Sequence, residues 1–239
     1  MLELIHNTDL RELDKYSMTA KNKIIKKNTP VSAFSLFPKS YNAIVQNLFL
    51  FIVVGGFGLV AQLILSLQIK VPEEATGFPT ISSQGAGIFT VALIVSIVLY
   101  TMSIKLQLSV ARGNKPTMNA LWEFARDNTF KMIGLGIVVS AVVVLGLIAF
   151  IVPGLIFIRR YVFSPYVMAD KKLGIFESMK QSADLTKPYS GAVWAVIGVS
   201  VLISFISVFG FVGSITSAIL AVCYSVAPAF RYEELKKLK

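Results

Sequence analysis

Two adjacent arginines, Arg159 and Arg160, lie inside a long apolar stretch of this sequence. If a membrane-crossing helix begins at Pro153, they lie about 10 Å from its start. An arginine near mid-bilayer costs about 2.5–3.5 kcal/mol. Two interpretations are open. The side chains extend to the outer headgroups or bond to neighbouring helices, or they form a site for an anion or a lipid phosphate in a polar cavity.

Pro165 lies about one helical turn beyond this pair. Its ring clashes with the carbonyl of Tyr161 and removes a helix hydrogen bond, which frees an acceptor near the arginines. Broken helices at membrane depth often mark binding sites. Because neighbouring helical residues point about 100° apart, we predict that Arg159 or Arg160, not both, faces the interior and binds an anionic group.

Residues of the kinds that carry catalysis or hold metals are scarce. The single histidine, His6, has no histidine or cysteine neighbour, and the single cysteine, Cys223, lies in an apolar block. No Asp or Glu lies inside an apolar block, which argues against a proton-coupled carrier. We therefore expect no catalytic residues, no metal and no cofactor, and we predict that the protein is not an enzyme.

A cluster of lysines in the N-terminal region is a further candidate for binding. Lys21, Lys23, Lys26 and Lys27 lie close together in a polar, basic segment. Each such charge contributes about 1 kcal/mol of attraction near an anionic membrane surface. The cluster is either an orientation signal in a solvated tail or a segment that docks on lipids or a protein.

The apolar residues gather in blocks long enough to cross a bilayer core of about 30 Å. Hydrophobic residues make up 55% of the chain and charged residues 15%, so we predict an all-α, polytopic bundle of six transmembrane helices. Residues 1–34 and 232–239 are expected to be basic cytoplasmic tails around a membrane domain at 35–231. The predicted spans are 41–69, 87–110, 130–151, 153–169, 189–209 and 211–230, with a turn at Pro153 and Gly154.

The distribution of positive charge predicts the orientation. Of the 23 lysines and arginines, Lys70 alone falls in a loop on the predicted outer side. Because cytoplasmic loops carry the excess of such residues, we expect both termini in the cytoplasm and the loop from Lys70 to Gln84 outside. The net charge of +10 is then an orientation signal, and no nucleic-acid partner is expected.

Three short segments that mix apolar and polar residues precede the first, third and fifth spans. They are Ser35–Asn47, Thr117–Asn128 and Gly174–Lys187, and such segments tend to lie in the headgroup plane. In the last of them, Ile175, Met179, Ser182 and Thr186 share one face. The chain thus divides into three units, each an amphipathic surface helix followed by a hairpin of two spans.

One run of residues resembles a known family. The pattern consists of a Val-Pro-Gly turn, a proline in the next span, an aspartate at its cytoplasmic end, then Gly-X-Phe-X-Ser-Met and Leu-Thr. Here these are Val152, Pro153, Gly154, Pro165, Asp170, Gly174, Phe176, Ser178, Met179, Leu185 and Thr186. The run resembles the YciC-like family of uncharacterised bacterial inner-membrane proteins, and more loosely the membrane domain of bacterial glycerophosphoryl diester phosphodiesterases. The resemblance implies a six-span protein but no catalytic residues, and it does not include Arg159 and Arg160.

These observations predict a multi-pass protein of the bacterial cytoplasmic membrane. We expect it to be non-enzymatic and to bind or organise membrane lipids, especially anionic ones, or other membrane proteins. The alternative is a transporter or flippase for an amphiphile with an anionic head group. A polar cavity reaching Arg159 or Arg160 would favour transport, and a packed interior with apolar outer grooves would favour binding.

Overall fold

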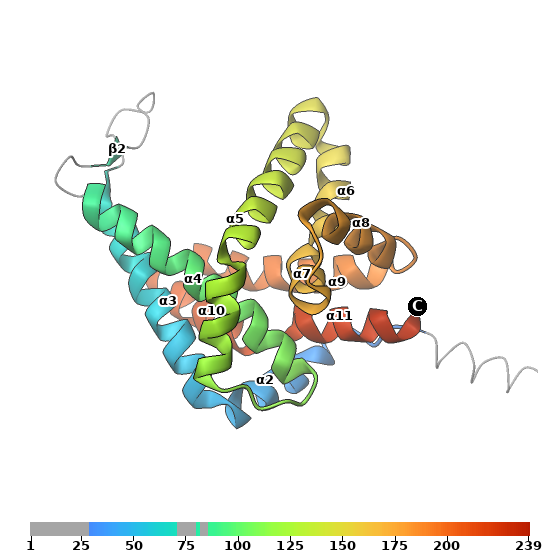
Figure 1. Cartoon of the computed structure of the whole chain (residues 1–239), viewed down its shortest axis with the longest axis horizontal. Helices are drawn as coiled ribbons and strands as arrows, with labels where there is room; N and C mark the ends of the chain where they lie inside the picture. The colour runs from blue at the N-terminus through green and yellow to red at the C-terminus, as the bar shows by residue number, and fades with distance from the viewer. Residues whose placement is uncertain (1–28, 71–79, 82–85) are drawn as a thin grey trace, which may run out of the picture.

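The structure is a computed structural model that describes residues 29–70, 80–81 and 86–239. Its fold is helical (Figure 1). The described helices are α2 Leu36–Gln46, α3 Leu48–Gln68, α4 Ala86–Ala111, α5 Met118–Ala149, α6 Ile151–Tyr161, α7 Ser164–Lys171, α8 Ile175–Thr186, α9 Ser190–Phe205, the 3₁₀ helix η1 Ile206–Phe209, α10 Gly210–Tyr224 and α11 Ala227–Leu238. Two short strands, β1 Ile69–Lys70 and β2 Thr80–Ile81, pair antiparallel between α3 and α4.

Four helical stretches among the described residues are long and apolar enough to cross a membrane. They are Ala86–Ala111, Met118–Ala149, Ser190–Phe209 and Val212–Leu238, and the bent pair Leu36–Gln46 and Leu48–Gly58 would make a fifth if it counts as one span. The predicted spans 87–110 and 189–209 are confirmed as helices within a residue or two. The predicted all-α class is also confirmed, because the described elements are helices apart from the two short strands.

The predicted continuous span 153–169 is wrong as a single helix. Helix α6 ends at Tyr161 and α7 begins at Ser164, with a turn at residues 162–163. Pro165 lies in the first turn of α7, where its missing N–H would be unpaired in any case. The proline therefore starts a new helix, because it cannot donate to the preceding turn.

The start of the predicted span 41–69 is also wrong. The axes of α2 and the first part of α3 differ by 96°, with the bend at Asn47. The Asn47 amide donates to the Ala43 carbonyl at 2.9 Å and closes the end of α2. Helix α2 instead matches the amphipathic segment predicted at Ser35–Asn47, and its face with Leu36, Ser40, Ala43 and Ile44 is buried.

The middle unit has no separate surface helix. Helix α5 runs unbroken from Met118 to Ala149 and joins the predicted segment Thr117–Asn128 to the third span. Asn128 and Thr129 donate to the carbonyls of Phe124 and Ala125, four residues back, so their polar side chains are satisfied without a break. The three-unit layout holds for α2 with α3–α4 and for α8 with α9–α10.

The residues expected as a basic tail, 232–239, belong to a packed helix. The predicted last span 211–230 is interrupted at Ser225 and Val226, between α10 and α11. Helix α11 has Pro228 in its first turn and buries Tyr232 and Leu235 against the protein. The sequence predicts a solvated tail here because residues 231–239 are rich in charged side chains.

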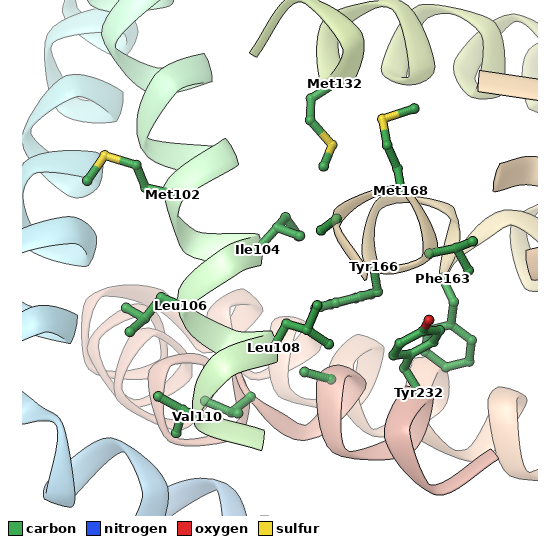
Figure 2. Close-up of a cluster of buried hydrophobic side chains, with 14 of the residues drawn as sticks. Met102, Ile104, Leu106, Leu108, Val110, Met132, Phe163, Tyr166, Met168 and Tyr232 are labelled. Carbon is green, nitrogen blue, oxygen red and sulfur yellow. The ribbon is translucent and has the colours of Figure 1, made fainter. Parts of the chain in front are cut away.

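The main core lies where α4, α5, α7 and α11 meet. Figure 2 shows Leu108 of α4 beside Tyr166 of α7, with Phe163 next to Tyr232 of α11. The rings of Tyr166 and Tyr232 stack with centroids 6.0 Å apart. The Tyr166 hydroxyl donates to Gln107 at 2.6 Å, which satisfies a buried polar group. This core holds the ends of four helices together.

Candidate functional site

Arg159 and Arg160 occupy the last turn of α6, and both side chains are half-buried. The Nε atom of Arg159 is buried and has no hydrogen-bond partner in the described part of the chain. A buried donor without a partner is uncommon and needs an explanation. Arg159 is thus the better candidate of the two for an external anionic partner, and the anion site stays a prediction.

The sequence predicted a free acceptor at the Tyr161 carbonyl, whereas the contact that the structure shows at the break between α6 and α7 is made by the neighbouring residue. The carbonyl of Arg160 accepts a hydrogen bond from the Ser182 hydroxyl of α8 at 2.7 Å. Ser182 is fully buried on the face predicted from the sequence, since Met179 and Thr186 are buried beside it. This acceptor is therefore satisfied by the protein itself, and α8 fastens the break.

The turn predicted at Pro153 and Gly154 lies three to four residues earlier in the structure. The chain turns at Phe150, whose backbone is extended, and both residues fall in the first turn of α6. Gly154 is buried, and a Cβ atom there would lie 2.4 Å from the side chain of Leu147 and 2.8 Å from its backbone nitrogen. The glycine therefore permits the close contact of α5 and α6.

The strongest electrostatic cluster is centred on Asp170, at the end of α7. Its carboxylate lies 2.5 Å from Arg112 Nη2 and 2.7 Å from Lys236 Nζ, and it accepts a hydrogen bond from the Tyr232 hydroxyl at 2.8 Å. Arg112 also pairs with Glu233 at 2.6 Å. The cluster joins residues next to α4 and within α7 and α11. We call these five residues the Asp170 cluster.

The surroundings of Asp170 keep it ionised. Burial by itself raises the pKa of this carboxyl group. The hydrogen bonds from Lys236, Arg112 and Tyr232 and the positive charge of Arg112 outweigh burial and lower the pKa to about 2. A carboxylate with three donors and such a pKa is a poor general base near neutral pH. The Asp170 cluster connects the end of α4 with α7 and α11 through ion pairs and a hydrogen bond.

A buried arginine of α11 holds the start of the described chain. Arg231 of α11 is fully buried, and it donates to Glu234 at 2.6 Å and to the Val31 carbonyl at 2.7 Å. Glu234 in turn accepts from the Val31 N–H at 2.6 Å. The Tyr224 hydroxyl donates to the Ala33 carbonyl at 3.2 Å. The segment before α2 is thus attached to α10 and α11.

Apolar grooves run between the helices. One of about 420 Å³ lies among α2, α3, α4 and α10, and is lined by residues that include Leu48, Phe51 and Leu106. Another of about 310 Å³ lies between α4 and α5, where Ile94, Ile97, Val98, Phe130 and Ile133 meet Trp122, Arg126 and Thr129. Neither Arg159 nor Arg160 lines these two grooves.

The structure does not test the remaining candidates. Lys21, Lys23, Lys26 and Lys27 lie outside the described residues. Within the described ranges, no three His, Cys, Asp or Glu side chains are grouped so that they could hold a metal ion. The predictions that the protein has no catalytic residues and no cofactor stay predictions.

No protein-family model, curated protein or solved structure matches this chain. The resemblance to the YciC-like family therefore stays a prediction as well.

The sequence analysis singled out Asp170 only as part of a family pattern and missed its partners. Lys236 is 66 positions further along the chain, so no local spacing could reveal the pair. The available signal was an aspartate directly after an apolar block, where an unpaired carboxylate would be costly to bury.

Proposed function

We propose that this chain is an integral protein of the bacterial cytoplasmic membrane that binds phospholipids and performs no catalysis. Large apolar side chains cover the outward faces of its long helices. Phe130 of α5 is 85% exposed, Ile148 76% and Phe209 of η1 77%. A water-soluble protein rarely exposes large continuous apolar surfaces, whereas lipid covers them at no cost.

Contacts between distant parts of the chain support six crossings with both ends on one side. Val31 is bonded to α11, Arg112 to Asp170 and Glu233, and Asp170 to Lys236. Residues near 31, 112, 170 and 233 thus lie together. Between successive members of this series the chain leaves and returns: through α3 and α4, through α5 and the broken α6–α7, and through α9 and α10 (Figure 1).

The charge distribution favours the cytoplasm for the side where these contacts gather. The loop from 112 to 117 and helices α8 and α11 carry lysines and arginines, whereas the turns at Phe150 and Gly210 carry none. By the positive-inside rule, the Asp170 cluster then faces the cytoplasm. The fourth crossing is the pair α6–α7. It is not an isolated straight helix, because it packs against α5, α8 and α9.

The observation that carries lipid binding is the groove between α4 and α5. Its walls are isoleucine, valine and phenylalanine side chains, and Arg126 and Trp122 lie along the same groove. Arg126 has Asp127 as its ion-pair partner, and both side chains are exposed. Such a pair is weak, so the guanidinium is available to a lipid phosphate while an acyl chain follows the apolar wall.

The test is mass spectrometry of lipids that remain on the full-length protein in mild detergent. We expect retained anionic phospholipid, and less of it on Arg126→Gln. Lys131→Gln is the matched control, because Lys131 is an exposed cation on the same helix outside the groove. Equal retention by both variants and the unaltered protein would refute binding in this groove.

Release of the chain from membranes by alkaline carbonate would refute the membrane proposal itself.

A further inference from the structure

A basic pocket lies apart from the apolar grooves, between α7, α8 and α11. Its volume is about 270 Å³, and its polar lining consists of Lys171, Lys236, Lys239, Gln181 and Tyr232. The apolar part of its wall includes Leu185 of α8, which is buried in the core. The pocket is thus a concave site with three ammonium groups around it. We call it the lysine pocket.

The side-chain charges around the lysine pocket do not cancel. Lys236 shares Asp170 with Arg112, and Arg112 is also paired with Glu233, so two cations and two carboxylates balance in that cluster. Lys171 donates to the neutral Gln181 amide at 2.5 Å. No ion pair to Lys171 or Lys239 occurs among the described residues. The lining side chains therefore leave a local excess of positive charge.

The donors are oriented by contacts within the protein. Asp170 holds Lys236 at the edge of the pocket at 2.7 Å. Because the Gln181 oxygen accepts from Lys171, its amide nitrogen keeps two N–H donors on the other side of the group. Ammonium and amide donors that meet in one concavity match a group with several acceptor oxygens and negative charge. A carboxylate offers two such oxygens, whereas a phosphate monoester offers three and more charge.

We propose that the lysine pocket binds a phosphate monoester. The ligand is either the head group of a lipid such as phosphatidic acid or a soluble phosphate ester. The lipid source rests on the proposed membrane function, because the pocket lies at the Asp170 cluster and hence at the cytoplasmic end of the crossings. Binding of the phosphate group itself does not depend on the membrane.

The experiment uses the purified full-length protein and native mass spectrometry with three probes: inorganic phosphate, dihexanoyl phosphatidic acid and dihexanoyl phosphatidylcholine. The test variant is Lys171→Gln with Lys239→Gln. The control is Lys180→Gln with Lys187→Gln, which removes two exposed cations of the neighbouring α8 segment outside the pocket. All four lysines are exposed, so neither double variant disturbs the core. At about fivefold per lysine, we expect the test variant to bind phosphatidic acid about 25-fold more weakly.

Each outcome of this experiment either supports or overturns the proposal. Binding of phosphatidic acid alone identifies a lipid head group, and binding of both phosphatidic acid and inorganic phosphate identifies a phosphate site open to soluble esters. Equal binding of phosphatidylcholine, absence of binding by all probes, or equal losses in the test and control variants overturns the proposal. A chain that resists carbonate extraction but binds none of the probes refutes the lysine pocket alone. A chain that carbonate releases but that binds inorganic phosphate refutes the membrane function alone.

Discussion

Arg112 Nη2 lies 2.5 Å from Asp170 Oδ1. The first residue directly follows α4, and the second lies at the end of α7. The whole of α5 and the broken helix α6–α7 separate them along the chain. A chain segment whose two ends are joined in this way must leave and return, so this ion pair argues that α6 and α7 together form the return path of α5.

Replacing Asp170 tests the importance of this connection. Asp170→Asn removes the charge that Arg112, Lys236 and Tyr232 share, and the Asp170 side chain is only 8% exposed. We expect a loss of about 1.5–3 kcal/mol, seen as a lower melting temperature in detergent. Asp127→Asn is the control, because its ion pair with Arg126 is exposed and should change stability by less than about 0.5 kcal/mol. Equal melting temperatures for the two variants would contradict this role.

The same carboxylate predicts how stability depends on pH. Its pKa falls from the usual 3.8 to about 2 in the folded protein. A group with a lowered folded pKa stabilises the protein above its unfolded pKa, and this contribution disappears as the pH falls toward the folded pKa. Thermal melting of the unaltered protein and Asp170→Asn from about pH 6 to about pH 3 should therefore show a difference that shrinks on acidification. A difference that is constant or grows would contradict the assignment.

Two buried serines of α8 offer a matched pair. Ser182 donates to the Arg160 carbonyl at the helix break, whereas the buried Ser178 hydroxyl has no partner in the described part of the protein. We expect Ser182→Ala to lose about 1–2 kcal/mol, because it leaves a carbonyl unpaired. Ser178→Ala should be neutral or slightly stabilising, because it removes an unpaired hydroxyl. Thermal melting checks both, and the reverse order would show that α8 does not fasten the break.

The two arginines of α6 should differ in lipid binding. Arg159 has a buried, unpaired Nε atom, so an anionic head group would supply the partner that the protein lacks. We expect Arg159→Gln to reduce retained anionic lipid and the stabilisation that added lipid gives. Arg160→Gln should change neither by a comparable amount. Mass spectrometry with melting curves, with and without anionic lipid, measures both quantities. Equal effects of the two substitutions would contradict a specific role of Arg159 in lipid binding.

The helices of this protein could be predicted from the sequence where the local signals agreed. Uninterrupted apolar runs fixed the limits of α4 and of α9 with η1 to within a residue or two. The segment predicted at Gly174–Lys187 agrees with α8 within a residue at each end, and its apolar spacing identified the buried Met179. In these segments length, hydropathy and local stop signals all favour the same structure.

The errors occurred where tertiary contacts decided the outcome. Pro165 was expected to interrupt the helix bonding, but the sequence did not show that Ser182, a residue of another helix, bonds the Arg160 carbonyl at the break. Helix α11 looked like a charged tail because the partners of Arg231 are Glu234 and the backbone of Val31, which is 200 positions away. The Asp170 cluster escaped notice for the same reason. Long-range pairs leave no periodic signal in one sequence.

The most direct test of the six-crossing membrane account is cysteine labelling in intact cells. The native Cys223 is first replaced by alanine, and single cysteines are placed at Ser82, Asn114 and Lys237. A maleimide that cannot cross the membrane should label Ser82→Cys in intact cells. It should label Asn114→Cys and Lys237→Cys only after permeabilisation, because the Arg112, Asp170 and Glu233 contacts hold both positions on one side, which the charge distribution predicts to be the cytoplasmic side. Labelling of Lys237→Cys in intact cells, or different accessibility of Asn114→Cys and Lys237→Cys, would contradict the account.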